Sequence, residues 1–125
     1  MADIALGIRS GSGDLENFAA QVNASYMVQW GELGLYDEDV EGWGQAFQQV
    51  VTRTLAAGGR IHFNLTGIDI QDALKGDPNT WVDRYTAWEL QQIVRNREWF
   101  GRTTFYAGGT TLTLKQVSDL GIVSL

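Results

Sequence analysis

The stretch Gly59–Gly67 reads GRIHFNLTG and contains the only histidine of the chain, His62. Ile61, Phe63 and Leu65 are apolar and alternate with polar residues. Successive side chains of a β-strand point to opposite faces, so this alternation predicts a strand with one apolar face and one polar face. The polar row consists of Arg60, His62, Asn64 and Thr66. It is either the solvated side of a sheet or the floor of an active site.

Two amphipathic helices are predicted before this strand. Apolar residues recur at helical spacing over residues 15–23, directly after Asp14, a residue type that favours the N-cap position. The strongest helical pattern covers residues 40–57, with Trp43 and Phe47 on its expected buried face, and the glycine pair at 58–59 ends it. Between the helices, residues 25–30 alternate weakly, as in a strand.

Three further features are predicted after the strand. A short helix over residues 70–75 precedes a loop, and a third helix follows with Thr86 and Glu89 at the spacing of a capping box. Residues 102–115 form two β-prone runs joined at Gly108-Gly109, the pattern of a hairpin. The last ten residues are expected to form a short turn or helix and a tail.

These elements indicate a single domain over residues 1–125. A hairpin combined with several helices is typical of the α+β class. We therefore expect a small antiparallel or mixed sheet with helices packed on one face. The length suits one domain with its own core, and 44% apolar residues supply the material for that core.

Composition excludes several functions. The chain has no cysteine, which rules out disulfides, thiol nucleophiles and Cys-ligated metals, and a single histidine makes a zinc enzyme improbable, so no cofactor or metal is expected. The net charge is −6, with eight acids and one base in residues 1–52. Phosphate contacts dominate nucleic-acid affinity, so an acidic chain is a poor general binder of nucleic acid, whereas a basic protein partner or a small anionic substrate is plausible.

Neither a membrane span nor a signal peptide is predicted. No apolar run approaches the roughly 20 residues of a spanning helix. The first residues lack the basic start and apolar run of a signal peptide. We therefore expect a soluble chain of unknown location, which, if exported, leaves the cell as part of a larger protein or through a dedicated apparatus.

The candidate catalytic residues are His62, Glu89 and Tyr85. Histidine is the side chain most easily tuned for proton transfer near neutral pH, and Glu89 would act as a base or orient His62. Candidate substrate-binding residues are Arg60, Asn64 and Arg95. We predict that His62 lies near Glu89 or Tyr85 in a cleft bordered by the third helix.

Each of these residues also has a structural interpretation. The polar row suits a wet sheet face, the capping box explains Glu89, and positive charge at a helix C-terminus explains Arg95. A further cluster lies on the hairpin, where either the Thr103 face or the face of Thr104 and Tyr106 could border the same site.

Several segments together resemble a known class of protein. The order ALGI…LENFAAQV, GRIHFNLTGID, YTAWELQQI and RTTFYAGG, within residues 4–109, is similar to the C-terminal effector domains of bacterial polymorphic toxins of the Rhs-type and contact-dependent classes. Many such domains are nucleases, others attack nucleotides or NAD or modify proteins, and each is usually neutralised by a dedicated immunity protein. The resemblance therefore implies a toxin-like hydrolase acting on RNA or a nucleotide by acid/base chemistry, with a cognate immunity protein as partner.

An alternative function is a non-enzymatic acidic interaction domain, such as an immunity-type inhibitor of a basic toxin. The two functions differ in where His62 lies. Convergence of His62 and Glu89 in a cleft favours an enzyme. A flat surface beside the acids of residues 32–41, with His62 in open water, favours binding.

Overall fold

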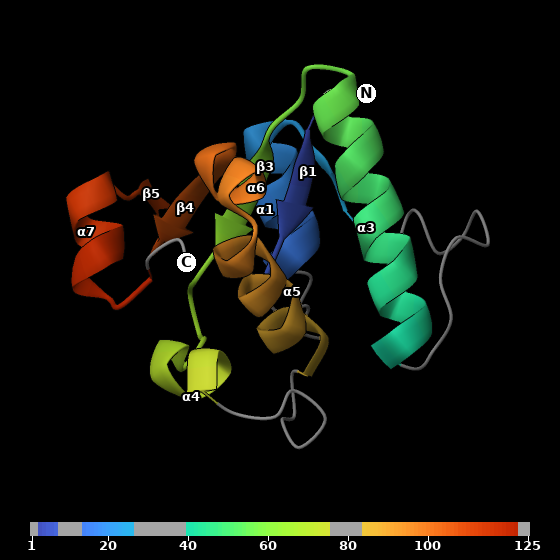
Figure 1. Ribbon diagram of the computed structural model, residues 1–125. Coiled ribbons are helices and arrows are strands. Elements are labelled where there is room, and N and C mark those ends of the chain that lie inside the picture. The colour runs from blue at the N-terminus through green and yellow to red at the C-terminus, as the bar shows by residue number, and fades with distance from the viewer. Residues whose placement is uncertain (1–2, 8–13, 27–39, 76–83, 123–125) are drawn as a thin grey trace.

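The computed structural model describes residues 3–7, 14–26, 40–75 and 84–122 (Figure 1). Their strands are β1 (Ile4–Leu6), β2 (Ser25–Tyr26), β3 (Ile61–Asn64), β4 (Thr103–Ala107) and β5 (Thr110–Thr111). Their helices are α1 (Asp14–Val22), α3 (Val40–Ala56), α4 (Ile70–Lys75), α5 (Arg84–Arg95), α6 (Arg97–Gly101) and α7 (Leu114–Asp119). Every predicted helix and strand that falls on these residues is therefore present.

The strands form one mixed sheet in the order β2-β1-β3-β4-β5. β2, β1, β3 and β4 pair in parallel, and β5 returns antiparallel to β4. Parallel neighbours need a crossover connection, and helices lie on the chain between each successive pair of the parallel strands. The predicted α+β class with a mixed sheet is confirmed, and the antiparallel alternative is limited to the hairpin.

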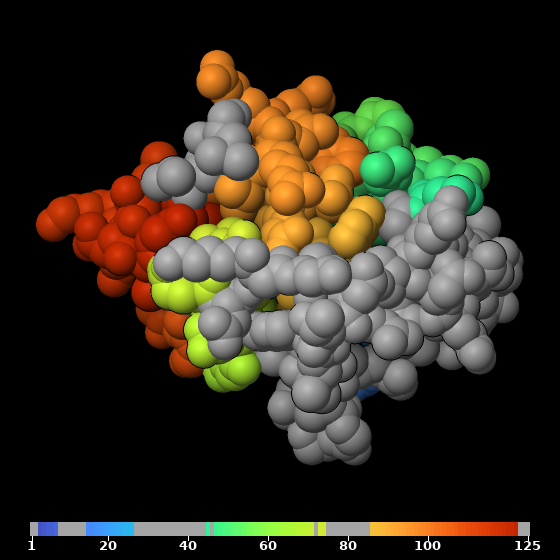
Figure 2. Space-filling model, turned by 60° about the horizontal axis from the view of Figure 1, so that its bottom comes forward, coloured from blue at the N-terminus to red at the C-terminus, as the bar shows by residue number. Residues whose placement is uncertain are grey.

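The larger core lies on the sheet face that carries Ile61 and Phe63. It joins these residues to Ile4, Leu6 and Phe105 from the neighbouring strands and to side chains of α3, α4 and α5. Figure 1 shows α5 and α6 on the near side of the sheet, and Figure 2 shows their surface between α7 and α3. The predicted packing of helices on one face of the sheet is therefore correct for most of the helices that the structure describes.

Helix α1 packs on the opposite face. Leu15, Phe18 and Ala19 form a second cluster with Ala5 of β1, and Tyr106 packs against it. The small side chain of Ala5 lets the helix approach the strand closely. This second layer, absent from the sequence-based prediction, leaves only part of the His62 face open.

Helix α3 is the central core element that its pattern predicts. Phe47, Val50 and Val51 are fully or almost fully buried. The Phe47 ring meets Trp88 and Trp99 edge-on, at centroid distances of 5.5 and 5.8 Å. The matching prediction for Trp43 concerns a side chain outside the described residues.

The hairpin turn lies where the glycine pair predicts it. Gly108 and Gly109 have φ of 60° and 80°, and positive φ at both central residues is the requirement of a type I′ turn. Glycine adopts this conformation without the steric cost of a Cβ atom. The turn therefore fixes the register that pairs Tyr106 with Thr111.

The predicted cap at Thr86 is wrong. α5 begins at Arg84, which puts Thr86 inside the first turn. The buried Thr86 hydroxyl donates to the carbonyl oxygen of Gly7 at 3.2 Å. Threonine suits this position because its hydroxyl ties the helix to the end of β1, a tertiary contact that competes with capping. A capping box does form elsewhere, between Thr113 and Gln116 at the start of α7.

Candidate functional site

The candidate site lies on the polar face of β3, around His62. The parallel register places His62 beside Ala5 of β1 and Thr104 of β4. Residues two positions apart on a strand share a face, so Asp3 and Tyr106 lie on the same side as His62. Adjacent strands are about 4.8 Å apart, which brings these three side chains within reach of one another.

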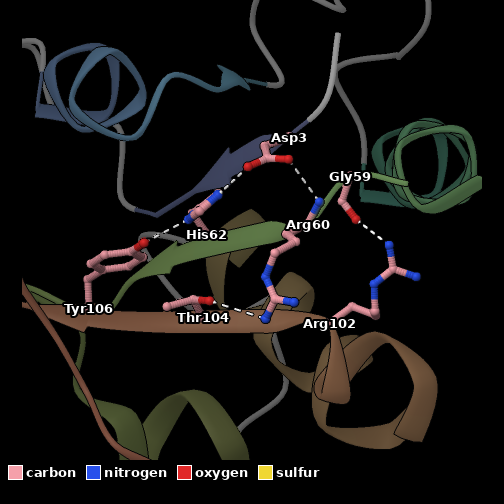
Figure 3. Close-up of polar contacts among 7 residues, drawn as sticks. All are labelled: Asp3, Gly59, Arg60, His62, Arg102, Thr104 and Tyr106. Atoms are coloured by element: carbon pink, nitrogen blue, oxygen red, sulfur yellow. Dashed lines mark hydrogen bonds and ion pairs between the residues drawn. The ribbon is translucent and has the colours of Figure 1, made fainter. Parts of the chain in front are cut away.

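Both ring nitrogens of His62 bond to these neighbours. Nε2 lies 2.6 Å from Oδ2 of Asp3, and Nδ1 lies 2.8 Å from the hydroxyl of Tyr106 (Figure 3). The other carboxylate oxygen of Asp3 accepts from the backbone N–H of Arg60 at 3.0 Å. Asp3, His62 and Tyr106 therefore form a continuous chain of hydrogen bonds across β1, β3 and β4, named here the Asp-His-Tyr relay.

The chemistry of the partners determines the tautomer of the neutral ring. An ionised carboxylate only accepts hydrogen bonds, so Nε2 must carry the hydrogen that bonds to Asp3. Nδ1 is then an acceptor and receives the O–H of Tyr106. A second proton on the ring would reverse that bond, because both nitrogens of a charged imidazole donate.

The Asp3 carboxyl is held in its charged form. Burial acts to raise its pKa, but this effect is outweighed by the hydrogen bonds from the His62 side chain and the Arg60 backbone and by the favourable electrostatic interactions with the same two residues. The pKa of Asp3 therefore lies below its ordinary value. An ionised Asp3 orients the imidazole through its contact with Nε2.

A cation lies beside the relay. The exposed Arg60 is on the same strand as His62, and its Nη2 donates to Thr104 Oγ1 at a long 3.5 Å (Figure 3). A guanidinium carries five N–H donors, and this contact engages one of them. The exposed group can therefore bind an anion next to the relay.

Among the described residues, the predicted cleft between His62 and the third helix is not formed. α5 packs on the other face of the sheet, where Leu90 and Ile93 meet Ile61 and Phe63 in the core. Because alternation directs His62 away from that face, the sheet separates it from α5. Because the apolar face of β3 packs against α5, its polar face, which carries His62, cannot contact that helix.

Glu89 and Arg95 on α5 share this separation. Glu89 is 3% exposed within α5, and Arg95 is exposed in its last turn. Tyr85 belongs to α5 too, but its side chain lies outside the described residues. Glu89 and Arg95 are therefore not brought together with His62, whereas Arg60, directly before β3, and Asn64, within β3, lie on the same face as His62.

Asn64 and Thr66 serve turns at the end of β3. The side-chain oxygen of Asn64 accepts from the Thr66 backbone N–H at 3.1 Å, and the Thr66 hydroxyl accepts from the Gly108 N–H at 2.8 Å. Gly7 also packs closely there, since a Cβ atom on it would lie 3.1 Å from the Asn64 carbonyl oxygen. These contacts give both side chains a structural role beside any role in binding.

Asp3 is the member of the site that sequence reasoning missed. It precedes a short apolar strand, and no local spacing links it to a residue 59 positions away. Tyr106 was noted only as part of a hairpin face that could border the site. The structure selects the face of Thr104 and Tyr106, because Thr103 instead donates to the Trp99 carbonyl oxygen at 2.7 Å.

Comparisons with family models, with curated proteins and with solved structures find no match for this chain. Among the residues that the structure describes, no helix is long and apolar enough to cross a membrane. The same residues hold no group of three or more potential metal-ligating side chains. Any assignment of function therefore depends on the geometry around His62.

Proposed function

We propose that this chain is a small acid/base enzyme domain of the bacterial effector type, acting on RNA or a nucleotide. The observation that carries the proposal is the relay of Asp3, His62 and Tyr106. An ionised carboxylate on one ring nitrogen and a proton donor on the other form the arrangement that makes histidine an effective base. The segment resemblance to polymorphic-toxin effector domains supports the same class.

A phosphate-containing substrate fits the surroundings of the relay. Cleavage of a phosphodiester requires removal of a proton from the attacking hydroxyl and stabilisation of negative charge on the phosphoryl oxygens. The relay would supply the first requirement and the Arg60 guanidinium the second. An arginine presents paired donors that match phosphate geometry, so Arg60 would hold the group beside the base.

The experiment incubates the purified chain with total bacterial RNA and, separately, with nucleoside triphosphates. His62→Gln keeps a donor near the position of Nε2 but cannot be protonated, so turnover should fall about 10²–10⁴-fold. Arg60→Gln should also lose activity, whereas Arg53→Gln, which removes an exposed cation of α3, should not. Full activity of folded His62→Gln, or no turnover of either substrate by the wild type, would contradict the proposal.

The charge distribution favours a second function, an immunity-type inhibitor. Residues 1–52 carry eight acids and one base, which suits binding to a basic protein. The neighbouring genes discriminate between the two functions. A large exported repeat protein encoded upstream favours the effector, and a toxin gene immediately before this one favours the inhibitor.

A further inference from the structure

We propose that Tyr106 is the catalytic residue that exchanges a proton with the substrate, and that His62 and Asp3 act only through it. This inference rests on the proposed function, because it names the residue that performs the acid/base step. The sequence-based prediction placed His62 itself in contact with the substrate. The hydrogen bonds of the ring lead to a different assignment.

The first argument is the occupancy of the imidazole. Nε2 is bonded to Asp3 at 2.6 Å and Nδ1 to Tyr106 at 2.8 Å, so each ring nitrogen already has a partner. The His62 side chain is only 12% exposed. A substrate hydroxyl cannot reach a ring nitrogen unless one of these bonds breaks. The phenol oxygen of Tyr106 is the end of the relay that remains for it.

The second argument is that Tyr106 is held in place. Its ring meets Phe18 of α1 edge-on at 5.0 Å and lies 5.7 Å from the His62 ring. Its backbone is paired on both sides, with Asn64 of β3 and Thr111 of β5. These contacts hold the ring in place, and Tyr106 as a residue is half-buried, so it is not fully enclosed. Such fixed geometry is what proton transfer requires.

The proton movements balance. The Tyr106 O–H proton passes to Nδ1 of His62 as the phenol oxygen removes a proton from the attacking hydroxyl, either of water or of a ribose. The new P–O bond forms, the P–O bond to the leaving oxygen breaks, and that oxygen takes a proton from water. The imidazolium, paired with the Asp3 carboxylate, then returns its proton from Nδ1 to the phenol oxygen as Tyr106 releases its own proton to the solvent. Arg60 would hold the phosphoryl oxygens during this exchange.

An aryl sulfonyl fluoride tests the activation of Tyr106 without knowledge of the substrate. The phenol oxygen attacks sulfur, an S–O bond forms and the S–F bond breaks, fluoride leaves, and His62 accepts the proton. Peptide mass spectrometry then gives the labelling rate of each tyrosine. We expect Tyr106 to be labelled faster than Tyr26, which serves as the reference within the same molecule.

Variants connect this reactivity to the relay. His62→Gln and Asp3→Asn should each slow labelling of Tyr106 by roughly tenfold or more, because general-base assistance is lost, and should leave Tyr26 unchanged. Thr111→Ala is the matched control. It alters the exposed residue paired with Tyr106 in the hairpin but leaves the relay intact, so the labelling rate should stay the same.

Turnover by Tyr106→Phe completes the test. Loss of turnover equal to that of His62→Gln, with relay-dependent labelling, supports the inference. Labelling of Tyr106 that is independent of His62 overturns the inference, even where His62→Gln abolishes turnover and the proposed function stands. Retained turnover in Tyr106→Phe overturns it as well. Should Tyr106→Phe fail to fold, the labelling rates of the other variants decide.

Discussion

At the scale of the residue, His62 is held between an acid and a phenol that lie 59 and 44 positions away in the chain. A polar side chain on a solvated sheet face needs no protein partner, because it can bond to water, whereas His62 makes two hydrogen bonds within the protein. They hold the ring in one orientation, and they connect three strands of the sheet. A stability effect of substituting His62 is therefore expected.

The Asp3 pairing should make stability depend on pH in the acid range. The folded pKa of Asp3 is lowered, so its contribution is present above the unfolded value of about 3.9 and disappears as the pH falls through the folded value. Urea unfolding of the wild type and Asp3→Asn from neutral pH downward measures this. We expect the wild type to be more stable near neutral pH, and the difference to shrink in acid. A difference that is constant across this range would contradict the pairing.

Phe47 is the residue whose loss should cost the most packing. It is fully buried and contacts two tryptophan rings. Phe47→Ala should lower the free energy of unfolding by about 3–5 kcal/mol, measured by chemical denaturation. Gln48→Ala, on the adjacent exposed position, should change it by about 0.5 kcal/mol or less. An unchanged denaturation midpoint in Phe47→Ala would contradict the conclusion that α3 is a central element of the core.

At the scale of the element, α5 is fastened to the sheet by its first turn. The Thr86 hydroxyl reaches the carbonyl oxygen at the end of β1, and Gln91 donates to the Ala73 carbonyl oxygen of α4 at 2.7 Å. Both donors are buried polar side chains of α5. These bonds fix where α5 lies along the sheet, which the apolar contacts alone would allow to slide.

Thr86→Val tests this fastening. Valine keeps the branched shape but leaves the buried Gly7 carbonyl oxygen without its donor, so the free energy of unfolding should fall by roughly 1–3 kcal/mol. Thr86→Ser retains the hydroxyl and should lose less. Thermal or urea unfolding distinguishes the two. Equal stability of the valine variant and the wild type would show that the bond contributes nothing.

At the scale of the whole molecule, one core connects the two ends of the described chain. The larger cluster contains Ile4 from the first strand and Ile122 beyond the last helix. The polar face carries the relay, and α1 packs beside it through Phe18 and Tyr106. The larger core on one face of the sheet thus stabilises the strands, and these strands hold the relay side chains in fixed positions on the other face.

This connection predicts a single cooperative unfolding transition. Elements from both ends contribute to one cluster, so loss of either should disrupt the other. Far-ultraviolet circular dichroism and tryptophan fluorescence should give coincident transitions in urea. Separate midpoints would contradict the prediction of a single domain over residues 1–125.

The sequence by itself determined the local elements. Alternation in Gly59–Gly67 predicts β3, helical spacing predicts α1 and α3, and the glycine pair predicts the hairpin turn. These signals are visible because each depends on residues only a few positions apart, whose side chains share one face of a helix or strand. For the same reason, the sequence indicated that His62 belongs to a polar face and that Arg60 lies beside it.

Only the tertiary structure decided which elements meet on that face. Strand order and parallel pairing bring Asp3 and Tyr106 to His62, while the direction of the apolar face sends Glu89 and Arg95 to the other side of the sheet. Neither the strand pairing nor the side of the sheet on which α5 packs can be predicted from local residue spacing. Both are set by crossover connections and by burial of the whole apolar surface. The sequence therefore indicated the histidine, and the packing of the sheet selected its partners.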